Sequence, residues 1–239
     1  LLSNGPEDMR LVDLSHDIAP FNIHEAALFL RRAVRRFPEG TIHLVVVDPG
    51  VGGSRRALLV RVGGQYLIGP DNSVFGYLYD GSEEVYELDP ERVCDGPPSS
   101  TFHGRDLFAP AAALLASGKE AESFARPIES YQHLVFPMVE LKGDSLLGRI
   151  IHIDHFGNLI TNVPESTLRG FMGDASDEEV SVHLLDRAVR GLLRRYEDAE
   201  SGHLLALVGS SGLLEVAARE KNAAHKLGAE VGLLVRVQR

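Results

Sequence analysis

The sequence predicts a two-domain α/β protein, with an α/β domain over residues 1–130 and an all-β domain over residues 138–239. A chain of 239 residues has room for one large domain or two small ones. In the N-terminal part, apolar strand patterns alternate with helical patterns, which is typical of a mainly parallel sheet. In the C-terminal part short strand patterns dominate, which favours a small barrel or sandwich.

The first elements of the N-terminal domain are a strand, a helix and a second strand. Leu11–Leu14 is a short apolar strand, and the apolar residues of Phe21–Phe37 have helical spacing. Ile42–Val47 is a continuous β-branched run, which is typical of a strand buried on both faces of a parallel sheet. Because a domain of this kind normally has an earlier strand and the chain opens without Met, we expect the given sequence to lack its true N-terminus.

The next elements are a hairpin, a strand and a helix. Ala57–Val62 and Tyr66–Ile68 flank a Gly-Gly pair, which is a hairpin signal. Val85–Leu88 is a further strand. Arg105–Ser117 is an apolar, Ala-rich helix that ends at Gly118.

Beyond a segment bracketed by Pro127 and Pro137, which we interpret as a linker, the pattern changes. One helix is expected there, over Asp186–Tyr196. The remaining apolar segments are short and are expected to be strands: Gly148–Ile153, Leu159–Val163, Val180–Leu184, Leu204–Val208 and Val231–Val237.

Composition excludes several classes of protein and partner. With 24 basic and 34 acidic residues the net charge is −10, which argues against a nucleic-acid backbone as the main partner. No run approaches the ~20 apolar residues that a membrane helix needs, so no membrane partner is expected. Cys94 is the single cysteine, so no intrachain disulfide and no thiolate metal cluster can form. Together with the lack of a visible signal peptide, this favours a cytoplasmic location.

The strongest local motif is the Gly-rich segment that begins at Asp48, directly after the most buried strand. Ligands of open α/β sheets bind at the carboxyl ends of strands, and the glycines that follow allow a sharp turn. Arg55 can return across this turn to Asp48. The alternative is a structural turn with a surface ion pair. The segment lacks the spacing and the Lys-Ser/Thr pair of a phosphate-binding P-loop.

A second polar group precedes the helix that begins near Arg105. Ser100 or Thr101 is expected to cap this helix, which places His103 at its N-terminus. The helix dipole there disfavours protonation, and a neutral imidazole can accept a proton from water or orient it. In the alternative interpretation Arg105 and Asp106 form an ion pair and His103 is merely exposed.

A third group lies between two strands of the C-terminal part. Asp154, Phe156 and Asn158 would suit a nucleoside, because an acid binds a hydroxyl, an aromatic ring stacks on a base and an amide pairs with a base edge. A metal site using His152, Asp154 and His155 is a competing hypothesis. The structural alternative is a tight turn with Gly157 and Asn158 at positive φ.

A fourth group, Ser210, Ser211 and Glu215, follows an apolar strand. Small hydroxyl side chains at such a position can hold a carboxylate. An ordinary Ser-Ser-Gly turn is the alternative.

Six ordered motifs, taken jointly, resemble the S-adenosylmethionine (SAM) hydroxide adenosyltransferases, the adenosine-forming SAM hydrolases related to the fluorinase and chlorinase. The resemblance runs from about Val12 to the C-terminus. The motifs are Leu14-Ser15-His16-Asp17-Ile18, the Asp48–Arg56 loop, Gly69-Pro70-Asp71-Asn72, Thr101–Asp106, Asp154–Asn162 and Ser210–Ala224.

This resemblance implies an N-terminal α/β domain, a C-terminal β-barrel domain and a homotrimer with its sites at subunit interfaces. It implies a catalytic set of Asp48, Arg55 and His103 that handles water. It places the substrate SAM, with no further cofactor and no metal, against Phe102, Gly104, Asp154, Phe156, Asn158, Ser210, Ser211, Glu215 and Ala223. Of these, Ser210, Ser211 and Glu215 are implied to face the methionine part, and Ala223 is implied to lie near adenine.

The implied reaction is attack of an activated water on C5′ of SAM, which releases L-methionine and adenosine. Relatives that use halide tend to carry tyrosines at the positions of Asp48 and His103, and the fluorinase has serine at that of Gly104, so this chain resembles the hydroxide-using members. Two features depart from the family: its opening Ser-Asp-Phe-Gly motif, which grips the ribose, is absent, and Ser73 stands where glycine is usual. The alternatives are a non-catalytic adenosine-binding or SAM-binding module, a metal-dependent hydrolase and a SAM-dependent halogenase.

Overall fold

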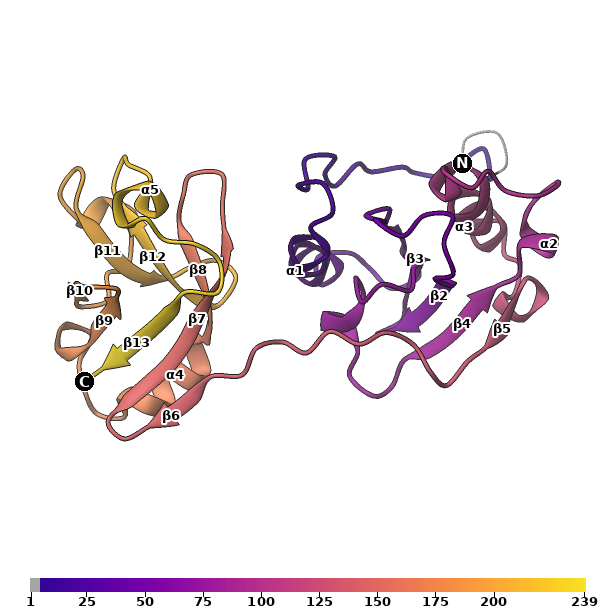
Figure 1. Ribbon diagram of the computed structural model, residues 1–239. Helices are drawn as coiled ribbons and strands as arrows, with labels where there is room; N and C mark the ends of the chain where they lie inside the picture. Colours follow the sequence, from indigo (N-terminus) through magenta and orange to yellow (C-terminus); the bar gives the residue numbers. More distant parts are fainter. Residues whose placement is uncertain (1–4) are drawn as a thin grey trace. The chain divides into compact units, whose positions relative to one another are not determined.

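The computed structural model describes residues 5–239 and divides the chain into two compact units (Figure 1). The first unit ends at Val135 and the second begins at Phe136. Among the described residues, no helix is both long enough and apolar enough to cross a membrane.

The first unit is built on a five-stranded mixed sheet with the strand order β1-β3-β2-β4-β5. Its strands are β1 (Ile42–Leu44), β2 (Ala57–Val62), β3 (Gln65–Pro70), β4 (Glu84–Leu88) and β5 (Ala125–Pro127). Only β1 and β3 pair in parallel, and the other three pairs are antiparallel. The expected hairpin is confirmed as β2 and β3.

The prediction of a mainly parallel sheet was therefore wrong. A continuous apolar run reports burial on both faces of a strand and carries no information about direction. The antiparallel strand β2 illustrates this, because five of its six residues are buried. The predicted strand Leu11–Leu14 was also wrong, since this segment has no regular structure and the side chains of Leu11 and Val12 are exposed.

Helices cover both faces of this sheet. Alternate residues of β2 point to different clusters: Leu58 and Val60 pack with α1 (Ile23–Val34), and Leu59 packs with α3 (Ala109–Ala116). The helix α1 is shorter than the predicted Phe21–Phe37, because Phe21 has a φ of 67°, which no right-handed helix contains. Asn22 then caps α1 by accepting a hydrogen bond from the Glu25 N–H at 3.0 Å.

The shorter helical pieces of the first unit connect these elements. They are the 3₁₀ turns Gly76–Leu78 and Ala121–Ser123, the helix α2 (Pro90–Val93) and a π-helical turn over Gly104–Phe108 that runs directly into α3. A π turn at the start of a helix is frequent at functional sites.

The second unit is a near-closed antiparallel barrel. Its strands are β6 (Glu140–Lys142), β7 (Ser145–Ile153), β8 (Leu159–Pro164), β9 (Ser181–Leu184), β10 (Arg187–Arg190), β11 (Leu204–Val208), β12 (Leu213–Ala218) and β13 (Leu234–Gln238). The order is β10-β9-β13-β7-β8-β12-β11, with β6 on β7, and the two outer strands β10 and β11 also contact each other. This favours the barrel over the sandwich that the sequence left open.

The predicted helix Asp186–Tyr196 was wrong, because Arg187–Arg190 forms strand β10 and the residues from Gly191 to Arg195 form no helix. Leu185 has a φ of 52°, and Arg187 pairs with Leu184, so β9 and β10 form a tight hairpin. The cross-strand pairing outweighs a local pattern that suits a helix. Two short helices, α4 (Glu165–Met172) and α5 (Ala223–Leu227), and the strands β6 and β12 were not predicted.

Candidate active site

The structure brings together three side chains from three separate segments of the first unit. Asp48 follows β1, Arg55 precedes β2, and His103 lies immediately before the π turn that leads into α3. Arg55 Nε donates to Asp48 Oδ1 at 2.9 Å, and Arg55 Nη2 donates to Asp48 Oδ2. Arg55 Nη2 also lies 2.9 Å from His103 Nδ1. The three residues, which we call the trio, therefore form one hydrogen-bonded chain.

The geometry defines the protonation state of the imidazole. A guanidinium has only donors, so His103 Nδ1 must accept the hydrogen bond from Arg55 and cannot carry a proton. His103 is then neutral, with its proton on Nε2. With His103 neutral, the charges of Asp48 and Arg55 cancel, and the Nε2–H group is a donor that Arg55 does not use.

Burial and charge both favour this neutral form. The pKa of His103 is lowered below 6.5, first by desolvation and then by the Arg55 guanidinium, while Asp48 and Asp106 act in the opposite direction. The sequence predicted a neutral imidazole, and the direction of that prediction is confirmed. The main cause is burial beside Arg55, whereas the prediction relied on the helix dipole.

The ion pair of the trio is buried, in contrast to the surface pair that was the alternative interpretation. The side chains of Arg55 and Asp48 are 10% and 5% exposed. The ring of Phe108 packs against Arg55 and His103, with the Arg55 Cζ 5.2 Å from its centroid and the His103 ring edge-on to it. Phe108 is fully buried and was not expected at the site, because an apolar residue inside a helix has no distinguishing sequence signal.

Close packing of two loops fixes the trio from both sides. Gly52 has a φ of 75°, and a Cβ built there would lie 1.8 Å from the Ser100 carbonyl oxygen. Only glycine allows the segment after Asp48 to approach the segment before His103 so closely. Gly104 packs tightly but less closely against Val46, since its Cβ would lie 3.0 Å from Val46 Cγ1.

The segment around Phe102 combines features of both interpretations of this motif. Arg105 does pair with Asp106, with a distance of 2.5 Å between Nε and Oδ1, and its guanidinium also lies over the Phe102 ring at 4.7 Å. The expected Ser or Thr cap is wrong, because the helical turn has no side-chain cap. Asp106 instead accepts a hydrogen bond from the Ser99 N–H at 3.0 Å. Phe102 is left 53% exposed beside His103, as a surface for stacking.

In the second unit, Asp154 organises a tight turn between β7 and β8. Asp154 Oδ1 accepts from the N–H groups of Phe156 and Asn158, both at 2.9 Å, and Oδ2 accepts from Asn158 Nδ2 at 2.9 Å. Gly157 has a positive φ, as the turn interpretation expected, and Asn158 does not. The turn holds Phe156 outward, with 74% of its surface exposed.

Glu215 lies near this turn, because β12 pairs with β8 and Glu215 is opposite Ile160. It is 6% exposed and accepts a hydrogen bond from the Tyr196 hydroxyl at 2.5 Å. Burial raises the pKa of Tyr196, and Glu215 and then Asp154 raise it further, which places all three near one another. Tyr196 was not predicted as a site residue, since no motif includes it.

The other expected contacts of the second unit differ in exposure. Ser210 and Ser211 lie in the turn between β11 and β12, with Ser210 exposed and Ser211 half-buried. Ala223 is fully buried in the core at the start of α5. The next residue, Ala224, donates its N–H to the Gly157 carbonyl at 3.0 Å, so α5 begins against the Asp154 turn.

Two further features lie apart from the trio. Within residues 5–239, no three His, Cys, Asp or Glu side chains are grouped so that they could hold a metal ion, so His152, Asp154 and His155 do not form such a group.

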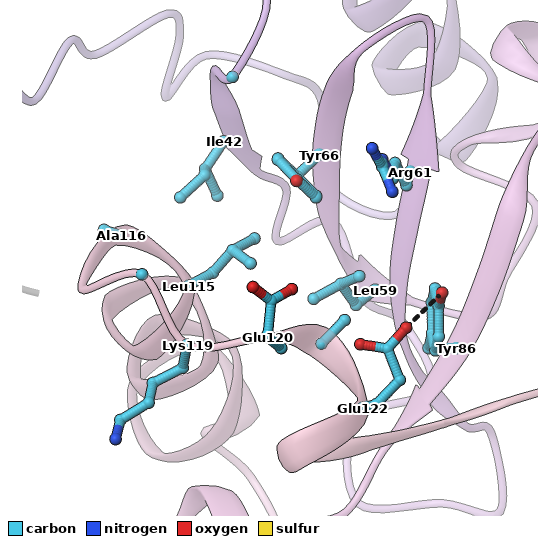
Figure 2. Close-up of a pocket in the computed structure, with 13 residues that line it drawn as sticks. Ile42, Leu59, Arg61, Tyr66, Tyr86, Leu115, Ala116, Lys119, Glu120 and Glu122 are labelled. Carbon is cyan, nitrogen blue, oxygen red and sulfur yellow. Dashed lines mark hydrogen bonds between the residues drawn. The ribbon is translucent and has the colours of Figure 1, made fainter.

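A hollow of about 260 Å³ lies between the C-terminal end of α3 and the start of β1 (Figure 2). Its polar rim includes Glu122, which accepts from the Tyr86 hydroxyl at 3.0 Å, and no member of the trio lines it.

Comparison with known families gives a match to both parts of the chain. Residues 1–125 match the SAM hydroxide adenosyltransferase N-terminal domain, and residues 148–236 match the SAM hydroxide adenosyltransferase C-terminal domain. The chain belongs to the SAM hydroxide adenosyltransferase family.

Individual relatives match nearly the whole chain. The (R)-S-adenosyl-L-methionine hydrolase of Thermus thermophilus is 35% identical over 95% of this chain and 87% of its own length. The hydrolase of the same name from Methanocaldococcus jannaschii is 30% identical over 96% of this chain and 83% of its own length. A fluorinase from Actinopolyspora mzabensis is more distant, at 26% identity over 98% of this chain and 88% of its own.

Two solved structures share the fold of this family member. An uncharacterized conserved protein from Thermotoga maritima has a TM-score of 0.87 and 31% identity, and the match covers 98% of this chain and 90% of that one. A conserved hypothetical protein from Thermus thermophilus has a TM-score of 0.73 and 33% identity, covering 95% of this chain and 86% of that one.

Proposed function

We propose that this protein is an adenosine-forming SAM hydrolase, which converts SAM and water to adenosine and L-methionine. The observation that carries the proposal is the buried trio, in which Arg55 joins Asp48 to a neutral His103. Full-length similarity to hydrolases named for this substrate supports it.

The reaction needs a positioned water and no acid for the leaving group. The water oxygen attacks C5′ from the side opposite the sulfonium, and the C5′–S bond breaks with its electron pair moving to sulfur. Methionine leaves as a neutral thioether, and the attacking water loses one proton to become the 5′-hydroxyl of adenosine. The protein contributes chiefly by aiming and desolvating this water.

The hydrogen bonding of the trio assigns a role to each member in this proposal. Asp48 accepts a hydrogen bond from the water and is the base, because its carboxylate is the only anionic acceptor in the trio. His103 donates from Nε2 to the water oxygen and orients it, since its Nδ1 lone pair is used by Arg55. Arg55 fixes both partners and stabilises the charge that develops on the oxygen.

The same charges favour water over halide as the nucleophile. A fluoride or chloride ion placed beside the Asp48 carboxylate would meet a like charge in a desolvated setting, which is strongly unfavourable. Water can donate to that carboxylate and accept from His103. The proposed activity is therefore hydrolysis, with halogenation as an outcome that the assay can detect.

Substrate contacts in this proposal come from both units. Phe102 and Gly104 lie beside the trio, and Phe156 offers a second exposed aromatic face for stacking on adenine. The buried Glu215 is suited to the ammonium group of the methionine part. The remaining proposed contacts are polar or small residues of the second unit: Asp154, Asn158, Ser210, Ser211 and Ala223.

We further propose that the protein is a cytoplasmic homotrimer in which the first unit of one subunit and the second unit of a neighbour share each substrate. The finer substrate assignment is the (R) configuration at sulfur, which the names of the hydrolase relatives specify. A chiral sulfonium places the methionine chain on one of two sides of the C5′–S bond. In this proposal the (R) epimer presents its ammonium to Glu215 while C5′ faces the trio.

The test is to incubate the protein with each SAM epimer and to quantify adenosine and methionine by liquid chromatography. We expect equimolar products from the (R) epimer, no sensitivity to chelators and no halogenated nucleoside when chloride or fluoride is added. Tight binding of adenosine without turnover would establish a binding module in place of a hydrolase. Formation of a 5′-halonucleoside would establish a halogenase.

A further inference from the structure

The motif Gly69-Pro70-Asp71-Asn72 lies outside the trio, yet it contacts the two residues that flank the loop over residues 48–55. At the leading end, the parallel ladder of β1 and β3 ends with the Val45 N–H donating to the Ile68 carbonyl at 2.9 Å. Pro70 has no N–H with which to continue it. Asn72 takes over, because its Nδ2 donates to the Val47 carbonyl at 2.9 Å. Asn72 therefore holds the peptide group directly before Asp48.

The orientation of the Asn72 amide is itself fixed. Its Oδ1 accepts from the Val74 N–H at 3.2 Å, which leaves Nδ2 directed at Val47. The intervening Ser73 has a φ of 77°, an unfavourable conformation for a residue other than glycine. The turn thus tolerates backbone strain at the residue that follows Asn72.

At the trailing end, Asp71 holds Arg56, the residue directly after Arg55. Asp71 Oδ2 accepts from Arg56 Nε at 3.0 Å and from Arg56 Nη2 at 2.7 Å, and the Asp71 N–H donates to the Arg56 carbonyl at 3.0 Å. The Asp71 side chain is only 4% exposed. A buried carboxylate with charge-assisted bonds of this kind restrains its partner far more than a surface ion pair does.

The second oxygen of Asp71 serves another segment. Asp71 Oδ1 accepts from the Gln132 N–H at 2.7 Å, in the stretch that leads to the end of the first unit. A purely structural role for Asp71, as an anchor for this stretch, is therefore the competing interpretation, and the experiment must separate the two.

We infer that Asp71 and Asn72 are positioning residues, which fix the two ends of the 48–55 loop so that Asp48 and Arg55 stay aligned with His103. The inference rests on the proposed function where activity is measured. A second measurement, of the His103 ring by NMR, depends only on the geometry of the trio. Because both residues act through the loop and touch no substrate group in the proposal, loosening either one should lower kcat and leave KM nearly unchanged. Misplacing a catalytic group by about 1 Å can cost on the order of 100-fold in rate.

The experiment compares Asp71→Asn and Asn72→Ala with the control Glu87→Gln. Glu87 accepts from Arg126 Nη2 at 2.8 Å between β4 and β5 of the same sheet, away from the loop. We expect kcat to fall about 10- to 100-fold in Asp71→Asn and about 3- to 10-fold in Asn72→Ala. The control should keep the kcat and KM of the wild type.

Nitrogen-15 NMR of the His103 ring, assigned with His103→Asn, supplies a measurement that needs no substrate. In the wild type we expect an unprotonated Nδ1 and a protonated Nε2, and in the two loop variants a mixture of tautomers as Arg55 moves away. If Asp71→Asn does not fold, Asn72→Ala and Arg56→Lys provide the same comparison.

The outcomes separate this inference from the proposed function. Wild-type kcat and unchanged His103 signals in the folded loop variants would overturn the positioning role, as would a loss confined to thermal stability. Failure of the wild type to form adenosine would overturn the proposed function instead. The positioning role would then still be decided by the His103 spectra.

Discussion

Arg55 Nη2 lies 2.9 Å from His103 Nδ1, although 48 positions of the sequence separate the two residues. The same nitrogen donates to Asp48, so one guanidinium joins a carboxylate to an imidazole. Arg55 is therefore the connecting member of the trio. Its positive charge favours the neutral form of His103, and a change at Arg55 must disturb both of its partners.

Replacing Asp48 with Asn removes the proposed base while keeping its shape. We expect kcat for SAM hydrolysis to fall about 100- to 10,000-fold, because general base catalysis typically contributes that much. Steady-state release of adenosine measures it, with Glu87→Gln as the control. Full activity in Asp48→Asn would show that this carboxylate does not act on the water.

The pH profile of kcat should have an acidic limb with a midpoint below 6.5. The pKa of His103 is lowered from 6.5 by burial and by Arg55, and protonation at Nδ1 would break its bond with Arg55. The neutral, active form therefore persists as the pH falls past the ordinary value and is lost only below the shifted pKa. In His103→Asn the rate should be lower and this limb absent. A midpoint above the ordinary histidine value would contradict the neutral assignment.

Tyr196→Phe should raise KM several-fold with little change in kcat. The Tyr196 hydroxyl donates to Glu215 at 2.5 Å, so its loss removes one restraint on the buried carboxylate. Glu215 is proposed to bind the methionine part, away from the bond that breaks, and ground-state and transition-state binding should weaken equally. Tyr86→Phe, which removes a comparable hydroxyl–carboxylate contact in the first unit, is the control. Equal KM values in the two variants would show that Tyr196 does not contribute to substrate binding.

Gly52→Ala should abolish most activity and destabilise the first unit by several kcal/mol. Its Cβ would lie 1.8 Å from the Ser100 carbonyl oxygen, so the two loops that contain the trio must separate. Gly63 has a φ of 57° and nothing within 4 Å of a built Cβ, which makes Gly63→Ala the matched control. The control should cost about 1 kcal/mol in the free energy of unfolding and keep full activity. Chemical denaturation and adenosine release together distinguish the two effects.

The stability of the first unit should decrease as the pH falls below 6.5, the ordinary pKa of histidine. Burial lowers the pKa of His43, and its Nε2 lies 2.6 Å from Gln65 Oε1. Since the native state then binds fewer protons than the unfolded state, the contribution to the free energy of unfolding is full above the unfolded pKa and is lost as the pH falls through the native one. His43→Leu should be less stable by about 1–3 kcal/mol at neutral pH, because Gln65 Oε1 loses its donor. It should also show a weaker pH dependence in urea denaturation, and an unchanged dependence would assign the effect to another group.

The three residues that the sequence singled out as catalytic lie together in the structure, whereas the predicted parallel sheet was wrong. Asp48, Arg55 and His103 occur in motifs with unusual local composition, and such motifs can be recognised without knowing the fold. Strand direction in the first unit could not be predicted in this way, because an apolar run carries no information about direction. The run Ile42–Val47 was also wrongly predicted to be a strand buried on both faces, since only Ile42–Leu44 forms β1 and Val46 is exposed. The helix expected over Asp186–Tyr196 failed for a related reason, since pairing with the neighbouring strand β9 decided its conformation.

By itself, the sequence determined which chemical groups are present, the family that they resemble and the two regions in which they lie. Only the tertiary structure decided that Arg55 bridges Asp48 and His103, which tautomer His103 adopts, and that Asp71 and Asn72 bind Arg56 and Val47 on either side of the 48–55 loop. Those features depend on hydrogen bonds between residues that are distant in the sequence. The Arg55–His103 bond forms only when the segment before α3 packs against the sheet, and the Asp71 and Asn72 bonds form only when β1, β2 and β3 pair. Local patterns fix what a residue can do, and packing fixes what it contacts.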